Sequence, residues 1–279
     1  MANSKYAYVR SFELPDNILP GTYMIVRLDG HSFHKFSTDH GFTKPNDETA
    51  LRLMDAAAIQ IMQAYPEVTM AFGESDEFSF LLRKSCNLFN RRSSKIASTF
   101  ASLFAATYTY RWAEFFPNTP LQYPPSFDGR VVAYPSSVEI RDYFSWRQAD
   151  THINNLYNTT FWALVLNGNL TTAEAHGKLK GTSSSQKQEI LFGQFGINYN
   201  ALPERFRKGS VLYRQEATAS VETPAAGVDN TPGQGSITAT SIVPPRRPRR
   251  EIVVEHCDII GPAFWSSRPS ILGGQPSPE

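Results

Sequence analysis

The order of strand-like and helix-like segments in the first 135 residues is the feature that most constrains how this chain can fold. β-Branched and aromatic residues predict four strands there, at 22–28, 68–72, 77–82 and 130–134. Apolar residues at helical spacing predict two long helices, at 46–64 and 94–112. The order β-α-β-β-α-β is typical of an α+β fold built on a split βαβ (ferredoxin-like) antiparallel sheet with flanking helices.

The rest of the chain divides at a sharp change of composition after Glu216. Additional helical segments, two or three in number, are predicted between residues 137 and 194. Residues 217–245 contain no aromatic residue, no Lys and no Arg, and are rich in Pro, Gly, Ser and Thr. Such a segment cannot bury enough apolar surface to offset its ordering entropy. We therefore expect 217–250 to be a disordered insertion, and 251–279 to be a returning strand, over 251–260, with a C-terminal segment.

The charges nearly cancel over the whole chain, with 27 Lys and Arg against 26 Asp and Glu, for a net charge of +1. This balance excludes a protein that binds nucleic acid simply by being basic overall, but it allows local basic patches. Three such clusters occur, and each is equally typical of a solvated face: Arg83, Lys84, Arg91, Arg92 and Lys95; Lys178, Lys180 and Lys187; Arg205, Arg207 and Lys208. We hypothesise that Arg92 and Lys95 contact phosphates.

The two cysteines, Cys86 and Cys257, show no paired spacing, which favours a reducing compartment. No apolar run is long enough to span a membrane, and the N-terminus lacks a secretory signal. We expect a cytoplasmic protein with no membrane partner. The N-terminus is acid-poor up to Glu13, so nuclear or mitochondrial pools also fit.

Carboxylates fall at two places that the predicted topology brings together. Asp29 closes the first strand, and Asp76 with Glu77 forms the tip of the hairpin between the second and third. In a split βαβ sheet the first strand lies beside this hairpin, so the carboxylates would converge on one edge. Carboxylates held close repel unless a cation is present, and Mg²⁺ suits such a site. Taken singly, each also fits an ordinary acidic turn or strand end.

The residues after Asp29 have the composition of a nucleotide site. Gly30 allows close backbone approach, and the following amides could bind phosphate. Phe33, His34 and Phe42 offer stacking faces for a base, whereas Phe36 is predicted to be core. Lys44, Asn46 and Asp47 stand at the start of a predicted helix, where free amides attract an anion.

Three motifs, in this order, resemble the tRNA-His guanylyltransferase family. They are Arg-Leu-Asp-Gly-His-Ser-Phe at 27–33, Phe-Gly-Glu-Ser-Asp-Glu-Phe-Ser-Phe at 72–80 and His-Ile-Asn-Asn-Leu-Tyr-Asn-Thr at 152–159. Further matches lie at 168–187, 195–199 and 256–260, so the resemblance covers most of 1–216 and 251–272. Three separate motifs in order make it highly specific.

The resemblance implies a palm-like catalytic core at 1–136 and a helical region at 137–216 that handles tRNA and nucleotide. It implies 3′–5′ nucleotidyl transfer to tRNA-His. ATP first activates the 5′-monophosphate, the GTP 3′-hydroxyl then attacks the adenylylated end, and pyrophosphate is removed. Two Mg²⁺ ions would clamp the attacking and leaving oxygens. The family forms homotetramers, built as a dimer of dimers.

The resemblance also implies roles for individual residues. Asp29 and Asp76, with the Gly30 carbonyl, match metal ligands, and Glu77 matches a residue needed near the metals. The nucleotide-contacting set is Asp29, Gly30, His31, Ser32, Phe33, His34, Lys44, Asn46, Asp47, Ser75 and Asp76. The set for tRNA or a second nucleotide is Arg27, Arg92, Lys95, His152, Asn155 and Lys187. His152 and Asn155, three residues apart, would share a helix face.

Other functions also remain open at this point. One alternative is a general 3′–5′ polymerase that repairs tRNA 5′ ends, and a more distant one is a nucleotide cyclase on a similar palm. A different class is a non-catalytic RNA-binding relative. The clustered carboxylates disfavour a pure RNA binder, because they would repel phosphates.

Overall fold

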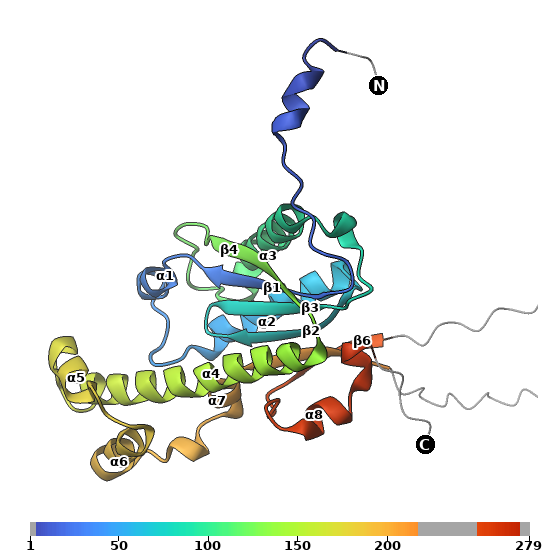
Figure 1. The fold of residues 1–279 in the computed structure, drawn as a ribbon. Coiled ribbons are helices and arrows are strands. Elements are labelled where there is room, and N and C mark those ends of the chain that lie inside the picture. The colour runs from blue at the N-terminus through green and yellow to red at the C-terminus, as the bar shows by residue number, and fades with distance from the viewer. Residues whose placement is uncertain (1–3, 217–249, 274–279) are drawn as a thin grey trace, which may run out of the picture.

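The structure, a computed structural model, describes residues 4–216 and 250–273, which fold around one antiparallel sheet (Figure 1). Within these ranges the sheet has the strand order β4-β1-β3-β2-β5-β6. The strands are β1 (Tyr23–Gly30), β2 (Val68–Glu74), β3 (Glu77–Leu82), β4 (Phe127–Tyr134), β5 (Ser210–Glu216) and β6 (Arg250–Glu255). Every neighbouring pair is antiparallel. The predicted α+β fold class is therefore confirmed.

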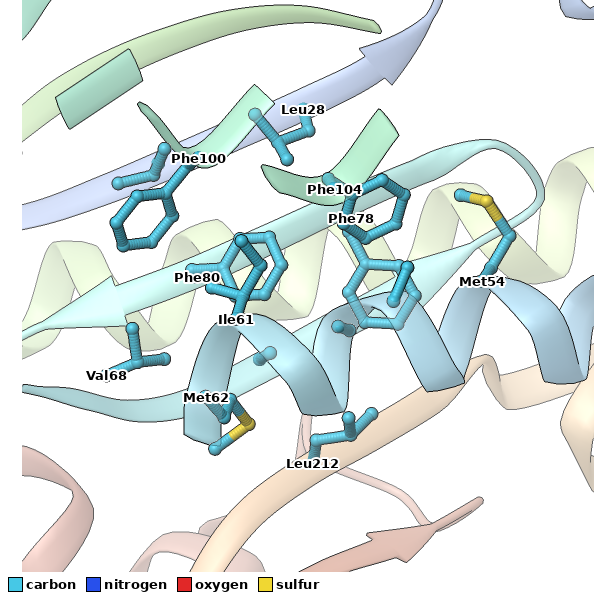
Figure 2. Packing of buried hydrophobic residues seen from close by; sticks show 14 of the residues in the cluster. Leu28, Met54, Ile61, Met62, Val68, Phe78, Phe80, Phe100, Phe104 and Leu212 are labelled. Atoms are coloured by element: carbon cyan, nitrogen blue, oxygen red, sulfur yellow. The ribbon is translucent and has the colours of Figure 1, made fainter. Parts of the chain in front are cut away.

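Both faces of the sheet are buried, because alternate residues of each strand point to opposite sides. Helices α2 (Glu48–Ala64) and α3 (Ser93–Phe115) cover one face. Figure 2 shows the packing there, where Leu28, Phe78 and Phe80 of the strands meet Phe100 and Phe104 of α3. The predicted core residue Phe36 belongs to this cluster.

Helix α4 (Ser137–Leu166) packs on the other face together with the short α8 (Pro262–Ser266). Its start is fixed by a capping box between Ser136 and Glu139. The C-terminal half of α4 extends past the sheet and carries α5 (Thr172–Leu179) and α6 (Ser184–Phe195) (Figure 1). The remaining helical segments are α1 (Phe33–Asp39), α7 (Glu204–Lys208), η1 (Ala7–Phe12), η2 (Leu88–Arg91), η3 (Tyr199–Ala201) and η4 (Pro269–Leu272). No helix in the described ranges is long and apolar enough to cross a membrane.

The four strands and two helices predicted in the first 135 residues are confirmed, in order. The region predicted to be helical at 137–216 ends in β5, which pairs with β2 and β6 in the sheet. The predicted insertion falls almost wholly on 217–249, outside the described residues.

The returning strand is shorter than predicted, because β6 ends at Glu255 and residues 256–260 leave the sheet. There the side chain of Gln148 on α4, instead of a neighbouring strand, provides hydrogen-bond partners for the backbone. Its Nε2 donates to the Cys257 carbonyl at 2.9 Å, and its Oε1 accepts from the Ile259 amide at 2.8 Å. The segment therefore binds α4 rather than β5.

Arg91, which the sequence places in a basic surface cluster, is buried, so its assignment to that surface is wrong. Its guanidinium donates to the carbonyls of Ile18 (3.1 Å), Cys86 (2.7 Å), Leu19 (3.0 Å) and Thr22 (2.9 Å). The residue thus joins the segment before β1 to the loop before α3. Arg205 of another predicted cluster likewise pairs with the buried Asp55.

We predict that Arg91→Met lowers the free energy of unfolding by about 3–5 kcal/mol, because buried carbonyls lose their donors. Urea unfolding followed by circular dichroism measures this change. The neighbour Arg92 is exposed and lies 3.4 Å from Asp16. Arg92→Met is therefore the matched control, with an expected change below about 1 kcal/mol. Equal effects of the two substitutions would contradict the structural role of Arg91.

Candidate functional site

Asp29, Gly30 and Asp76 lie side by side at one edge of the sheet. The register of β1 on β3 places Asp29 opposite Glu77, and Ser75 and Asp76 form the turn between β2 and β3. The Gly30 amide donates to the Asp76 carbonyl at 3.1 Å, which joins the end of β1 to this turn. The two carboxylates therefore come from elements whose relative position is set by the backbone.

Glycine is required at position 30 by its neighbours. A Cβ there would lie 2.5 Å from Cδ2 of Phe33 and 2.9 Å from the Asp76 Cβ. After Gly30 the chain turns into α1 through Ser32, which has a left-handed backbone (φ 54°). The His31 amide is already used, since it donates to the Ser126 carbonyl at 2.9 Å. The amides at the start of α1 are the ones that remain for a ligand.

Asp29 and Asp76 are available for a cation. Burial, together with the charge of Asp29, raises the pKa of the Asp76 carboxyl. Within residues 4–216 and 250–273, neither carboxylate forms a salt bridge with a basic side chain. The same ranges contain no group of three or more His, Cys, Asp or Glu side chains arranged to hold a metal. A cation here would therefore need backbone and ligand oxygens besides the two carboxylates, which suits Mg²⁺.

The Glu77 carboxylate binds Arg147 and is not one of the two carboxylates available for a cation. Its side chain points to the α4 side of the sheet, where its Oε1 accepts from Arg147 Nε at 2.8 Å. The same guanidinium binds Asp150 at 2.9 Å and also pairs with Glu74. Burial raises the pKa of Glu77 to about 7, although Arg147 opposes the shift. Glu77 thus neighbours Asp76 in sequence and Asp29 in register, but its carboxylate belongs to the ion cluster around Arg147.

A cavity of about 610 Å³ opens beside Asp76. Seven residues of the predicted nucleotide-contacting set line it: Phe33, His34, Lys44, Asn46, Asp47, Ser75 and Asp76. Its opposite wall comes from α4 and α5, and includes Tyr157, Phe161, Trp162 and His176. The Tyr157 hydroxyl and His176 Nδ1 are 2.6 Å apart. The volume and the aromatic lining suit a nucleotide.

Sequence patterns did not predict the aromatic wall of this cavity. Tyr157 and Phe161 are four residues apart on α4, so they share a face with each other, and their rings stack at 6.3 Å. That spacing is equally typical of a helix face packed in a core. Only the position of α4 beside the cavity shows that this face lines an open space.

The loop between α1 and α2 forms the third wall of the cavity, and each of its polar residues has a partner. Asp47 caps α2, accepting from the Ala50 and Thr43 amides at 3.0 Å each. Lys44 donates to Ser37 at 2.9 Å, and burial lowers the pKa of its ammonium. Asn46 donates to Asn155 Oδ1 at 2.8 Å. The loop is therefore held by α1, α2 and α4 together.

His152 and Asn155 share a face of α4, as predicted, and both contact the Tyr199 hydroxyl. Asn155 Nδ2 donates to it at 3.1 Å, and His152 Nδ1 lies 3.3 Å away. Burial lowers the pKa of His152. Asn155 is buried, and its side chain joins Asn46 to Tyr199.

Four basic residues of the predicted tRNA or second-nucleotide set lie outside the cavity lining. Arg27, on β1, is 3.8 Å from Glu77, on the α4 side of the sheet. Arg92 and Lys95 are exposed at the start of α3. Lys187, on α6, donates to the Thr182 carbonyl at 2.7 Å.

Family comparisons match nearly the whole described chain. A family model described as tRNAHis guanylyltransferase matches residues 6–135, and one described as the Thg1 C terminal domain matches 138–261. A probable tRNA(His) guanylyltransferase of Dictyostelium discoideum is 49% identical, with 99% of this chain and 100% of the relative aligned. The tRNA(His) guanylyltransferase of Saccharomyces cerevisiae is 55% identical over 77% of this chain and 92% of its own.

Solved structures agree with these matches. The crystal structure of the Saccharomyces cerevisiae enzyme superposes with a TM-score of 0.72 at 53% identity, covering 75% of this chain and 93% of that one. A bacterial tRNA(His) guanylyltransferase-like protein in complex with ATP superposes with a TM-score of 0.62 at 26% identity, covering 74% and 85%.

We predict that Arg147→Met lowers the free energy of unfolding by about 3–5 kcal/mol at pH 8, because Glu74 and Glu77 lose their buried cation. The loss should shrink at pH 5.5. A raised carboxyl pKa means that the folded variant binds protons more tightly than the unfolded chain, so acid favours folding. Urea unfolding at both pH values measures this. Arg141→Met, an exposed change on the same helix, is the control. A pH-independent loss for Arg147→Met would contradict the ion cluster.

Proposed function

The chain belongs to the tRNA(His) guanylyltransferase family, and from this premise we infer that it adds a single guanosine to the 5′ end of tRNA-His. The reaction is 3′–5′ nucleotidyl transfer: ATP activates the 5′-phosphate, the GTP 3′-hydroxyl attacks the activated end, and pyrophosphate is removed. The observation that carries this assignment is the pair Asp29 and Asp76, joined through Gly30 beside a nucleotide-sized cavity.

The residues of this chain act by binding and positioning. Asp29, Asp76 and the Gly30 carbonyl would hold Mg²⁺, proposed as two ions. Bound Mg²⁺ would supply charge stabilisation at the phosphoryl oxygens and favour ionisation of the attacking hydroxyl. Nucleotidyl transfer depends on in-line positioning of the attacking hydroxyl and the leaving group more than on a covalent intermediate with the protein. The cavity walls provide it: aromatic rings of α4 for the base, and the loop around Asn46 for orientation.

The donor set supports Mg²⁺ on chemical grounds. Two carboxylates without basic partners in the described ranges, one of them with a raised pKa, repel each other and favour a cation between them. Oxygen is the only ligand type that they and the neighbouring backbone offer. A site with few protein ligands leaves positions for phosphate oxygens of GTP or ATP.

We propose that tRNA-His binds through exposed cations rather than through overall charge. Arg92 and Lys95 stand free of the cavity at the start of α3 and remain candidates for phosphate contacts, as do Arg27 and Lys187. A homotetramer and a cytoplasmic location, with nuclear or mitochondrial pools, are part of the same proposal. The family membership supports the tetramer.

The alternatives are weaker. A general 3′–5′ polymerase for tRNA 5′ ends would use the same kind of site, but the relatives at 49% and 55% identity carry the name tRNA(His) guanylyltransferase. A nucleotide cyclase or a non-catalytic RNA binder fits neither these relatives nor carboxylates aligned beside a nucleotide cavity.

We predict that Asp29→Asn and Asp76→Asn each lower guanosine addition at least about 100-fold, because a cation loses a charged ligand. The assay follows 5′-monophosphorylated tRNA-His with ATP, GTP and Mg²⁺, and resolves both the adenylylated intermediate and the one-nucleotide extension. Asp128→Asn is the matched control, because Asp128 lies opposite Asp29 on β4 and is exposed beside Arg130. Its activity should stay within about threefold of wild type. Full activity of the Asp29 and Asp76 variants would refute the site.

We predict that Asn155→Ala raises the KM for GTP about tenfold and lowers the free energy of unfolding by about 1–3 kcal/mol, since Asn46 and Tyr199 lose a buried partner. The exposed neighbour gives the control, Asn154→Ala, which should change neither quantity. Steady-state kinetics with GTP and tRNA varied separately measure the effect. If the KM for tRNA rose instead, with stability unchanged, Asn155 would be a direct tRNA contact.

A further inference from the structure

The hydroxyl of Tyr108 on α3 is buried and has no hydrogen-bond partner among the described residues. Its side chain lines the cavity beside Asp76, the one whose volume suits a nucleotide. A buried hydroxyl without a partner is a net cost to folding, because it has given up its hydrogen bonds to water. Such a group in the wall of a binding cavity calls for an explanation, and a ligand supplies one.

Other buried tyrosines in the described ranges, 4–216 and 250–273, all place their hydroxyl within hydrogen-bond distance of a partner. Tyr23 donates to the Leu272 carbonyl at 2.8 Å, Tyr143 lies 2.7 Å from the Ser79 hydroxyl, Tyr199 donates to the His152 carbonyl at 3.2 Å, and Tyr213 donates to Glu255 Oε1 at 2.8 Å. Tyr108 therefore differs from every other buried tyrosine that the structure describes. The described part of the chain does not itself supply a partner for this hydroxyl.

The ring of Tyr108 is enclosed by aromatic neighbours and cannot turn to reach a partner elsewhere. The ring centroids of Phe33, Phe36, Trp112 and Phe127 all lie 6.0–6.2 Å from its own. Close packing of this kind restricts a side chain to one rotamer. The hydroxyl is thus held in one position at the cavity before any ligand arrives, which lowers the entropy cost of binding.

The charges around the hydroxyl indicate which part of a nucleotide it can contact. Burial raises the pKa of Tyr108 well above its usual range, and the negative charges of Asp47 and Asp76 raise it further. The hydroxyl therefore keeps its proton and can donate a hydrogen bond as well as accept one. Two carboxylates nearby repel phosphate at this point. A neutral group, such as a sugar hydroxyl or the edge of a base, fits the position better.

We propose that the Tyr108 hydroxyl forms a hydrogen bond with the sugar or the base of the nucleotide in this cavity. The inference rests on the proposed function, because it takes the ligand to be a nucleotide, and it makes Tyr108 a substrate-binding residue. Phosphates are left to the cation at Asp29 and Asp76. Because the hydrogen bond exists only in the complex, removing the hydroxyl affects the free protein and the complex in opposite directions.

The decisive variant is Tyr108→Phe in the full chain, which removes the hydroxyl and keeps the ring. Without nucleotide, its thermal midpoint should rise by about 2 °C, because a buried hydroxyl without a partner is lost. Equilibrium dialysis with GTP and Mg²⁺, in the absence of tRNA, should give a dissociation constant about tenfold above that of wild type. A merely structural role for the hydroxyl predicts the opposite shift of the midpoint.

Tyr143→Phe is the matched control, because Tyr143 is also buried but lies outside the cavity lining. Its hydroxyl already has a partner in Ser79, so the substitution should lower the thermal midpoint by about 3 °C. The dissociation constant for GTP should stay within about twofold of wild type. The two variants thus exchange their effects on stability and on binding.

Two further ligands show which part of the nucleotide meets the hydroxyl. Tripolyphosphate has neither sugar nor base, so wild type and Tyr108→Phe should bind it equally. With 2′,3′-dideoxy-GTP, a difference between the two proteins that disappears assigns the partner to the sugar hydroxyls. A difference that persists assigns it to the base.

Three results would overturn the assignment of Tyr108. They are an unchanged dissociation constant for GTP in Tyr108→Phe, an equal loss of affinity for GTP and tripolyphosphate, and a lowered thermal midpoint of the variant without nucleotide. A wild type that does not bind GTP at all would instead contradict the proposed function, and this inference with it. The comparison of wild type with the variant therefore tests Tyr108 separately from the function of the site.

Discussion

The backbone register of β1 on β3 is the constraint on which the site depends. It sets Asp29 opposite Glu77 and brings the Gly30 amide onto the Asp76 carbonyl. A shift of one residue would move Asp29 to the face covered by α2 and α3 and send Leu28 to the opposite side. Leu28, Phe78 and Phe80 oppose such a shift, because all three are buried in that core. The hydrophobic packing of the sheet therefore also aligns the carboxylates.

The register of the hairpin also places two acidic side chains close together, and a basic residue of α4 neutralises them. Glu74 and Glu77 face each other across the hairpin, and both are largely buried. Two buried like charges would disfavour the strand pairing that the site needs. Arg147 stands between them and also binds Asp150, so the cluster has its cation from the helix that carries the second half of the protein. The packing of α4 on the sheet and the pairing of β2 with β3 therefore stabilise each other.

Sequence patterns predicted the order of strands and helices along the first 135 residues and placed Asp29 at a strand end and Asp76 in a turn, because alternation and a polar turn are local signals. Other features depend on tertiary partners that no local signal contains. Arg91 sits in a basic run like its exposed neighbour Arg92, and only the fold decides which of the two is buried. Likewise, the end of β6 depends on Gln148, more than 100 residues earlier. α1 was missed because its seven residues follow a left-handed Ser32 and include aromatic side chains that also suit a strand.

The contacts of the polar segment around His152 show what its side chains connect. His152 and Asn155 meet at the Tyr199 hydroxyl, and Asn155 continues to Asn46 in the cavity wall. Tyr199 is therefore connected to the cavity wall through two hydrogen bonds, neither of which involves a strand of the sheet. Asp29 and Asp76, by contrast, lie at the end of β1 and in the turn between β2 and β3, which the Gly30–Asp76 backbone hydrogen bond joins. Different elements therefore position the two parts of the site: the β1–β3 backbone positions the carboxylates, and the hydrogen bonds from Asn46 through Asn155 to Tyr199 position the cavity wall.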